Sequence, residues 1–249
     1  MTRIPVIHRR SLCALAAIVT ACGCGASQPD ERLQMATGAP SKPATLGLQP
    51  LKLGGSRDAL LYVPTTYVPA EPLPLLVLLH GAGGSASNWF GSYADRAESA
   101  RFVMLAPDSR GSTWDAIHGA FGADVEFINR ALESVASQIA VDRNRMALVG
   151  FSDGATYALS LGLANGDLFT HVVAYSPGFV VQSTPRGKAK YFFSHGTGDP
   201  ILPIDNASRA LVTIFRSQGY QVDFVEFDGG HEVPAAISTQ ALGWLAADW

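Results

Sequence analysis

Apolar and polar residues alternate along most of the chain in blocks whose lengths suit the strands and helices of an α/β protein. Short apolar runs, typical of strands buried on both faces, occur at residues 60–63, 75–80, 102–106, 146–149, 171–175, 191–194 and 222–227. Longer segments with helical spacing lie between them, at residues 89–100, 124–139, 154–164, 205–218 and 234–247. This alternation predicts a mostly parallel sheet with helices on both faces. No connection is long enough for a cap domain, so we expect an open site.

The first residues follow a different pattern. Three arginines precede an apolar run at residues 12–21 that is too short to span a bilayer, which predicts a signal peptide over residues 1–21. The run ends in the letters VTAC, similar to a bacterial lipobox, with cleavage before Cys22 and lipid on its sulfur. The resulting protein would be an exported lipoprotein of the cell envelope. An ordinary secretory signal with an incidental cysteine is the alternative. The pair Arg9-Arg10 leaves twin-arginine export open.

Residues 22–52 are rich in Ala, Gly, Ser and Pro and show no sustained period, which predicts a flexible tether. Residues 53–249 then form the α/β domain. All three cysteines of the chain precede residue 53, so no disulfide is expected in that domain. The hydrophobic content of 47% is enough for a large core.

The charge balance excludes some function classes. The net charge is −3, and removal of a leader that carries arginines and no acid makes it more negative. This argues against nucleic-acid binding and against electrostatic binding to anionic lipid. The sequence contains no internal repeat, no CxxC pair, no metal-spaced histidine cluster and no Walker loop, so neither a metal nor an organic cofactor is expected.

The most informative motif is Gly150-Phe151-Ser152-Asp153-Gly154, which stands between a predicted strand and a predicted helix. Strand, G-x-S-x-G and helix in that order describe a nucleophile elbow, where a sharp turn leaves little room for side chains two positions either side of the serine. The alternative reading of Ser152 is a helix N-cap.

Two possible partners of Ser152 follow it. Asp199 and His231 each come just past the end of a predicted strand, and such ends line one crevice in an open α/β sheet. A serine hydroxyl needs an imidazole to take its proton and a carboxylate to orient that imidazole. Asp228, a possible turn residue, and Asp205, which suits an early helical position, are the rival acids.

A glycine-rich loop, HGAGGS at residues 80–85, follows another buried strand. In an α/β hydrolase this loop supplies one backbone N–H to the oxyanion hole, and the residue after the nucleophile supplies the other. Those residues would be Ala82 and Asp153. His80 and His195 are expected to support their loops rather than to react.

Four motifs in order, LLHGAGGS, GFSDGA, HGTGDPILP and GGHEVP, resemble the small carboxylesterases of the phospholipase/carboxylesterase group of α/β hydrolases. The resemblance covers about residues 60–249. It implies Ser152, Asp199 and His231 as the triad, with Ala82 and Asp153 as oxyanion donors. Acyl-protein thioesterases of the group carry Gln after the nucleophile, whereas this chain has Asp153.

The hypothesis is therefore a serine esterase that cleaves short-chain or aryl esters through an acyl-enzyme intermediate. Trp114 and Phe179 follow predicted strands and are candidates for the substrate pocket. A lysophospholipase or thioesterase on the same residues is one alternative. A non-catalytic lipoprotein that binds a ligand is the other.

Overall fold

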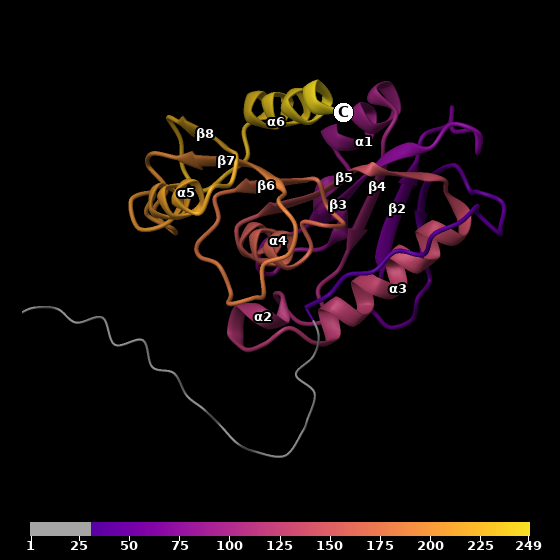
Figure 1. The fold of residues 1–249 in the computed structure, drawn as a ribbon, viewed down its shortest axis with the longest axis horizontal. Helices are drawn as coiled ribbons and strands as arrows, with labels where there is room; N and C mark the ends of the chain where they lie inside the picture. The colour runs from indigo at the N-terminus through magenta and orange to yellow at the C-terminus, as the bar shows by residue number, and fades with distance from the viewer. Residues whose placement is uncertain (1–30) are drawn as a thin grey trace, which may run out of the picture.

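The computed structural model describes residues 31–249, and these fold around one sheet of eight strands (Figure 1). The strand order is β1-β2-β4-β3-β5-β6-β7-β8. The first two pairings, β1 with β2 and β2 with β4, are antiparallel, and all the others are parallel. The strands are β1 (Gly47–Pro50), β2 (Ala59–Val63), β3 (Leu73–Leu79), β4 (Val103–Pro107), β5 (Val141–Phe151), β6 (His171–Tyr175), β7 (Lys190–Gly196) and β8 (Val222–Phe227).

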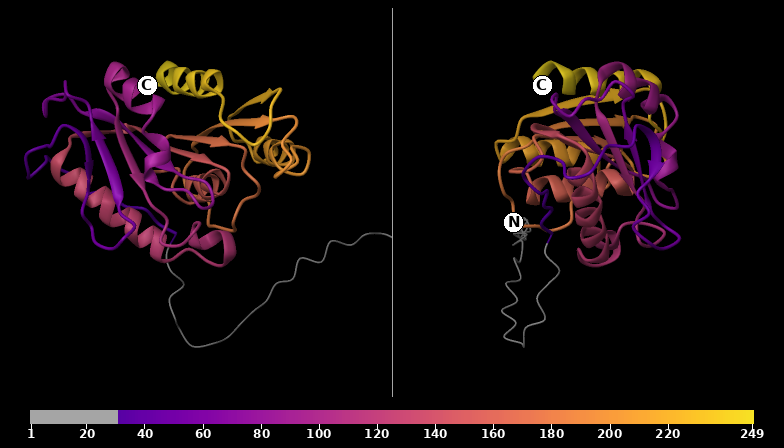
Figure 2. Two further views of the ribbon diagram at one scale, coloured as in Figure 1. Left: turned by 180° about the vertical axis from the view of Figure 1, so that it is seen from behind. Right: turned by 90° about the vertical axis from the view of Figure 1, so that its right-hand side faces the viewer.

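Helices cover both faces of the sheet, as the pattern predicted (Figure 2). One face carries α3 (Ala123–Gln138), α4 (Asp153–Ala164) and α5 (Ser208–Ser217), with the short α2 (Asp115–His118) beside them. The other face carries α1 (Ser92–Ala100) and α6 (Ala235–Asp248), with the 3-10 helix η1 (Ala86–Trp89) before α1. Each face has its own core, because β3 and residues 146–150 of β5 are buried on both sides. The predicted α/β fold is confirmed.

The order of the central strands determines where a site can form. The chain runs from β3 to β4 on one side and then returns to β5 on the other side of β3. The loops after β3 and β5 therefore diverge at the carboxyl end of the sheet, the place where open α/β sheets bind ligands. The predicted elbow at Ser152 and the glycine-rich loop at residues 80–85 both start there.

The predicted tether is wrong from residue 31 onward. Leu33 is 1% exposed and belongs to the core, and β1 adds an edge strand to the sheet. The side chain of Asn165 accepts from the Leu33 N–H at 2.8 Å and donates to the Glu31 carbonyl at 2.9 Å. Asn129 makes the same kind of pair with the backbone of Gln34 and Arg32. These side-chain amides supply hydrogen-bond partners to the backbone N–H and C=O groups of an extended segment whose composition resembles a linker.

The signal peptide, Cys22 and the start of the tether lie outside the described residues. In residues 31–249 no helix is both long enough and apolar enough to span a membrane.

Candidate active site

Ser152 stands between the end of β5 and the start of α4 and has a backbone conformation that side-chain-bearing residues rarely adopt, with φ 57° and ψ −121°. The flanking glycines are required by contact with the backbone. A Cβ at Gly150 would lie 2.1 Å from the Gly154 carbonyl oxygen, and a Cβ at Gly154 would lie 2.0 Å from the Leu79 oxygen. The sharp turn therefore packs directly against β3, as expected for a nucleophile elbow.

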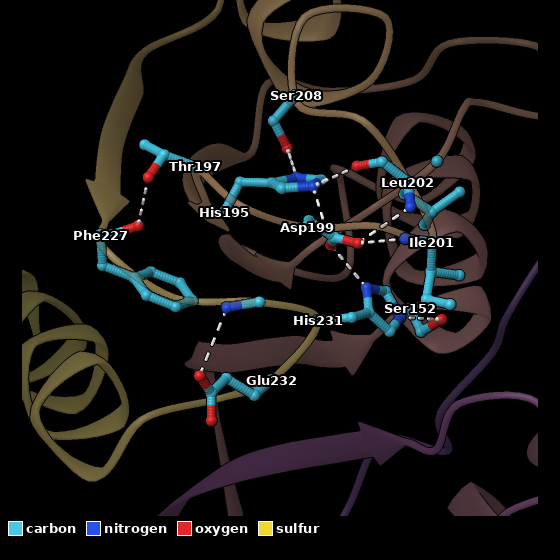
Figure 3. Close-up of polar contacts among 12 residues, drawn as sticks. Ser152, His195, Thr197, Asp199, Ile201, Leu202, Ser208, Phe227, His231 and Glu232 are labelled. Carbon is cyan, nitrogen blue, oxygen red and sulfur yellow. Dashed lines mark hydrogen bonds and ion pairs between the residues drawn. The ribbon is translucent and has the colours of Figure 1, made fainter.

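Asp199, in the loop after β7, and His231, in the loop after β8, reach Ser152 from neighbouring strands (Figure 3). The His231 Nε2 atom is 2.8 Å from Ser152 Oγ, and its Nδ1 atom is 2.6 Å from Asp199 Oδ2. Both distances are within hydrogen-bond range. The structure thus brings together the three side chains that the sequence pointed to, in an order that allows proton transfer from serine to imidazole.

The carboxylate of Asp199 is fully buried and well supplied with donors. Its Oδ1 atom accepts from the N–H groups of Ile201 at 2.8 Å and Leu202 at 2.9 Å, while Oδ2 accepts from His231. Burial alone would raise the pKa of Asp199, but the N–H of Leu202 and the imidazole of His231 outweigh it and hold the pKa below its ordinary value. The acid stays ionised and keeps one orientation.

The rival acids do not occupy this position. Asp205 pairs with Arg209 at 2.7 Å on the surface, and Asp228 is exposed. Asp205 lies in the turn before α5 and not in the helix, and Asp228 lies in the loop after β8, whereas the Nδ1 atom of His231 faces Asp199.

His195 braces the acid loop from behind. Its Nδ1 lies 2.7 Å from Ser208 Oγ, and its Nε2 lies 2.8 Å from the Leu202 carbonyl oxygen (Figure 3). A carbonyl can only accept, so Nε2 carries the proton and the Ser208 hydroxyl donates to Nδ1. Burial lowers the pKa of His195, which favours this neutral form.

The glycine-rich loop lies against the nucleophile. A Cβ at Gly81 would be 3.3 Å from the Cβ of Ser152, so the backbone just before Ala82 passes close to the nucleophile. Gly83 has φ +69° and donates its N–H to the Ser112 carbonyl at 2.7 Å. Asp153 is the first residue of α4, where backbone N–H groups have no acceptor within the helix. Asp153 thus adjoins the nucleophile in the chain, and Ala82 follows a residue that lies against it.

His80 holds this loop and does not face Ser152. It is 1% exposed, and its Nε2 accepts from the Ser109 N–H at 3.0 Å, so the proton is on Nδ1, which donates to the Gly81 carbonyl at 2.7 Å. Burial lowers the pKa of His80, in keeping with the neutral ring. Arg57 adds a second donor to Nε2 at 3.2 Å and binds the Gly84 carbonyl at 2.9 Å. Nothing in the local sequence around Arg57 signals this role.

A pocket of about 440 Å³ opens beside the loop, within the usual size range of small-molecule sites. Its aromatic walls are Trp89, Tyr93 and Phe151, and the Phe151 ring lies 4.9 Å from the His231 ring, which places the pocket next to the site. The remaining lining residues are His80, Gly81, Ala82, Gly84, Asn88, Gly91, Val233, Ala235 and Ser238.

The prediction that Trp114 lines the pocket is wrong. Its indole is fully buried, stacks on Tyr157 with ring centroids 5.0 Å apart and donates to the His80 carbonyl at 2.8 Å. It packs beneath the loop instead of beside a substrate. Phe179 is 45% exposed and lies outside the lining of this pocket. Local sequence offers no reason to choose Trp89 over Trp114, because both residues follow strands that end at the same edge of the sheet.

Within residues 31–249 no group of three or more His, Cys, Asp or Glu side chains could hold a metal ion. The chemistry available at this edge of the sheet is that of a hydroxyl, an imidazole, a carboxylate and backbone N–H groups.

Comparisons with known proteins give a family, several relatives and a set of structures with the same fold. The Esterase family model, described as "Putative esterase", matches residues 52–233. Feruloyl esterase C of Emericella nidulans is 28% identical over 227 residues, which cover 75% of this chain and 82% of the fungal protein. Among solved structures, esterase PE8 superimposes with a TM-score of 0.62 at 18% identity, covering 76% of this chain and 97% of the other. The Bacillus cereus carboxylesterase superimposes with a TM-score of 0.60 at 19% identity, covering 80% of this chain and 98% of the other. The family match shows that the chain belongs to the esterase family, and with the α/β-hydrolase fold described above it is a carboxylesterase-type hydrolase, which acts on carboxylic esters.

Proposed function

We propose that Ser152, His231 and Asp199 are the catalytic triad of this esterase and that the N–H groups of Ala82 and Asp153 form its oxyanion hole. The observation that carries the proposal is the continuous set of contacts from Ser152 Oγ through His231 to Asp199, at 2.8 and 2.6 Å. The strained backbone of Ser152 supports it as well, since strain of this kind gathers at functional sites.

In the acylation half-reaction, Ser152 Oγ attacks the ester carbonyl carbon while its proton passes to His231 Nε2. The carboxylate of Asp199 stabilises the resulting imidazolium through Nδ1. The carbonyl oxygen gains negative charge in the tetrahedral intermediate, and the backbone N–H donors stabilise that charge. Collapse of the intermediate breaks the bond to the alcohol oxygen, which takes the proton from His231, and leaves the acyl group on Ser152.

Deacylation repeats these steps with water. His231 takes a proton from the water as its oxygen attacks the acyl carbon, and then returns that proton to Ser152 Oγ as the carboxylic acid leaves. One imidazole therefore serves as base and acid in both halves of the reaction.

The substrates that fit best are esters with a short or an aromatic acyl group. Three aromatic rings, those of Trp89, Tyr93 and Phe151, line a pocket of limited volume beside His231. Planar rings stack well against such walls. The name of the relative from Emericella nidulans, feruloyl esterase C, points in the same direction, since a feruloyl group is an aromatic acyl group. A lysophospholipase binds a flexible alkyl chain, which cannot stack on aromatic rings, so the aromatic walls favour an aryl ester over it.

We also propose that the chain is exported and anchored to a membrane of the cell envelope by lipid on Cys22. The arginine-rich start, the short apolar run and the letters VTAC at residues 19–22 support this. A Cys22→Ala variant should lose the lipid and move from the membrane fraction to the soluble one in a detergent-partition assay. Equal partitioning of both proteins would favour a simple secreted enzyme.

The triad assignment is tested with Ser152→Ala, His231→Ala and the double variant. Each single change should lower ester hydrolysis by about 10³-fold or more, and the double variant should lose little beyond either, because the two residues act as a unit. A fluorophosphonate probe should label the wild type and not Ser152→Ala. Substantial turnover by folded Ser152→Ala would refute the assignment.

A further inference from the structure

The residue after the nucleophile is acidic, and this creates an electrostatic problem for the proposed mechanism. The backbone N–H of Asp153 is one of the two proposed oxyanion donors, yet the same residue carries a carboxylate. A negative charge on the residue that donates to the oxyanion repels the charge that grows on the substrate oxygen and raises the barrier to the tetrahedral intermediate. The side chain of Asp153 therefore has to be held in place and its charge offset.

Among the residues that the structure describes, Thr113 contacts that carboxylate. Thr113 Oγ1 donates to Asp153 Oδ2 at 2.6 Å, a short distance typical of a hydroxyl bound to an ionised oxygen. Thr113 is 8% exposed, so this hydrogen bond is largely shielded from water. The contact joins α4 to the segment of residues 108–114, which follows β4.

The segment that carries Thr113 is itself fixed to the other half of the proposed oxyanion hole. The Ser109 N–H donates to His80 Nε2 at 3.0 Å, and the Trp114 indole donates to the His80 carbonyl at 2.8 Å. The Ser112 carbonyl accepts from the Gly83 N–H at 2.7 Å. Residues 108–114 thus contact both the glycine-rich loop and Asp153, and they hold the two donors in one arrangement.

We propose that Thr113 is a positioning residue for ester hydrolysis, whose hydroxyl fixes the Asp153 carboxylate and offsets part of its charge so that the oxyanion can form beside it. The inference rests on the proposed function, because it takes the Asp153 N–H as an oxyanion donor. It concerns the transition state alone, since an uncharged ester carbonyl experiences little of this repulsion. Loss of the hydroxyl should therefore affect kcat and leave KM almost unchanged.

The test is a double-mutant cycle between Thr113→Val and Asp153→Asn, with kcat and KM measured on one aryl ester. Valine keeps the shape of threonine and removes the hydroxyl, and asparagine keeps the shape of aspartate and removes the charge. Thr113→Val should lower kcat about tenfold when residue 153 is aspartate and less than about twofold when it is asparagine. Thr113→Ser should restore most of the activity. Thr213→Val, on the exposed face of α5, is the matched control and should behave as wild type.

A purely structural role for Thr113 predicts a different result. Thr113→Val would then lower kcat equally in both backgrounds, in parallel with a loss of thermal stability, and this would overturn the proposal; so would unchanged kcat in the aspartate background. Thr113→Ala should repeat the result of Thr113→Val if the valine variant does not fold. Ser152→Ala is assayed alongside. If it is inactive while the cycle shows no coupling, only the role of Thr113 fails, whereas an active Ser152→Ala refutes the proposed function and this inference together.

Discussion

His195 Nε2 lies 3.1 Å from Asp199 Oδ2, the same carboxylate oxygen that His231 contacts at 2.6 Å. A second, buried histidine therefore backs the acid of the proposed triad from inside the protein. The neutral ring of His195 also donates to the Leu202 carbonyl, so the same Nε2 atom contacts the loop after β7 at both Asp199 and Leu202. This contact and the N–H donors give Asp199 a defined orientation that an exposed carboxylate lacks.

Asp199→Asn should lower kcat by about 10³-fold, because an amide in this position favours the wrong tautomer of His231 and cannot stabilise its imidazolium. Asp228→Asn is the control: Asp228 is exposed, and its substitution should change kcat by less than about threefold. Steady-state kinetics on a short-chain ester measure both. The reverse ranking would make Asp228 the acid.

The pocket predicts how activity depends on the acyl group. A buried methylene is worth about 0.8 kcal/mol, but only where the protein has room to cover it. With a pocket of about 440 Å³ beside the site, kcat/KM should peak at short acyl or aryl esters and should not jump when the substrate forms micelles. A rise that continues through palmitoyl esters would contradict this and revive the lysophospholipase hypothesis.

Trp89→Leu tests which aromatic residue contacts the substrate. Trp89 lines the pocket, so its loss should lower kcat/KM for an aryl acyl ester about tenfold and leave an acetyl ester nearly unaffected. Phe179→Leu is the control. It also replaces an aromatic ring by leucine, but Phe179 lies outside the pocket lining, so kcat/KM should stay unchanged for both esters. Equal effects of the two substitutions would move the aryl site away from Trp89.

Gly154→Ala should be strongly destabilising, by about 3 kcal/mol or more, because its Cβ would lie 2.0 Å from the backbone of β3 and neither element can move aside. Gly243→Ala on α6 provides the comparison. Its Cβ meets nothing within 4 Å, and alanine is favoured in a helix by about 1 kcal/mol. Urea unfolding should rank the two variants on opposite sides of wild type, and comparable stabilities would contradict the close packing of the elbow.

Three buried histidines make stability depend on pH. Burial lowers the pKa of His80, His171 and His195 below the ordinary value of about 6.5, so the unfolded chain binds protons that the folded chain does not. Their contribution to stability is complete well above pH 6.5 and is lost as the pH falls below it. The thermal unfolding midpoint should drop between pH 7.5 and pH 5. His171→Gln should flatten this dependence, and a midpoint that stays constant over the range would argue against buried neutral rings.

Much of this protein could be predicted from local sequence. The bounds of β6 and β8 agree with the apolar runs to the residue, and the other predicted elements agree within about three residues, except that β5 begins at Val141, well before the predicted run at residues 146–149. Ser152, Asp199 and His231 could be singled out because each follows a strand, and parallel strands bring their ends to one edge. The glycines of the elbow carry a signal of their own, since only glycine tolerates the backbone contacts found there. These inferences all depend on short stretches of chain and on general rules of α/β topology.

Only the tertiary structure decided the parts that depend on distant partners. Residues 31–46 look like a linker until Asn129 and Asn165 supply hydrogen bonds from far along the chain. Trp89 and Trp114 both follow a strand that ends at the same edge of the sheet. The first lines the pocket, and the second is buried beneath the glycine-rich loop. Each packs against residues that no local pattern reveals. The contact between Thr113 and Asp153 joins residues 40 positions apart. The apolar pattern of a segment determines whether it is buried, whereas the residues it contacts depend on how all the strands and helices pack together.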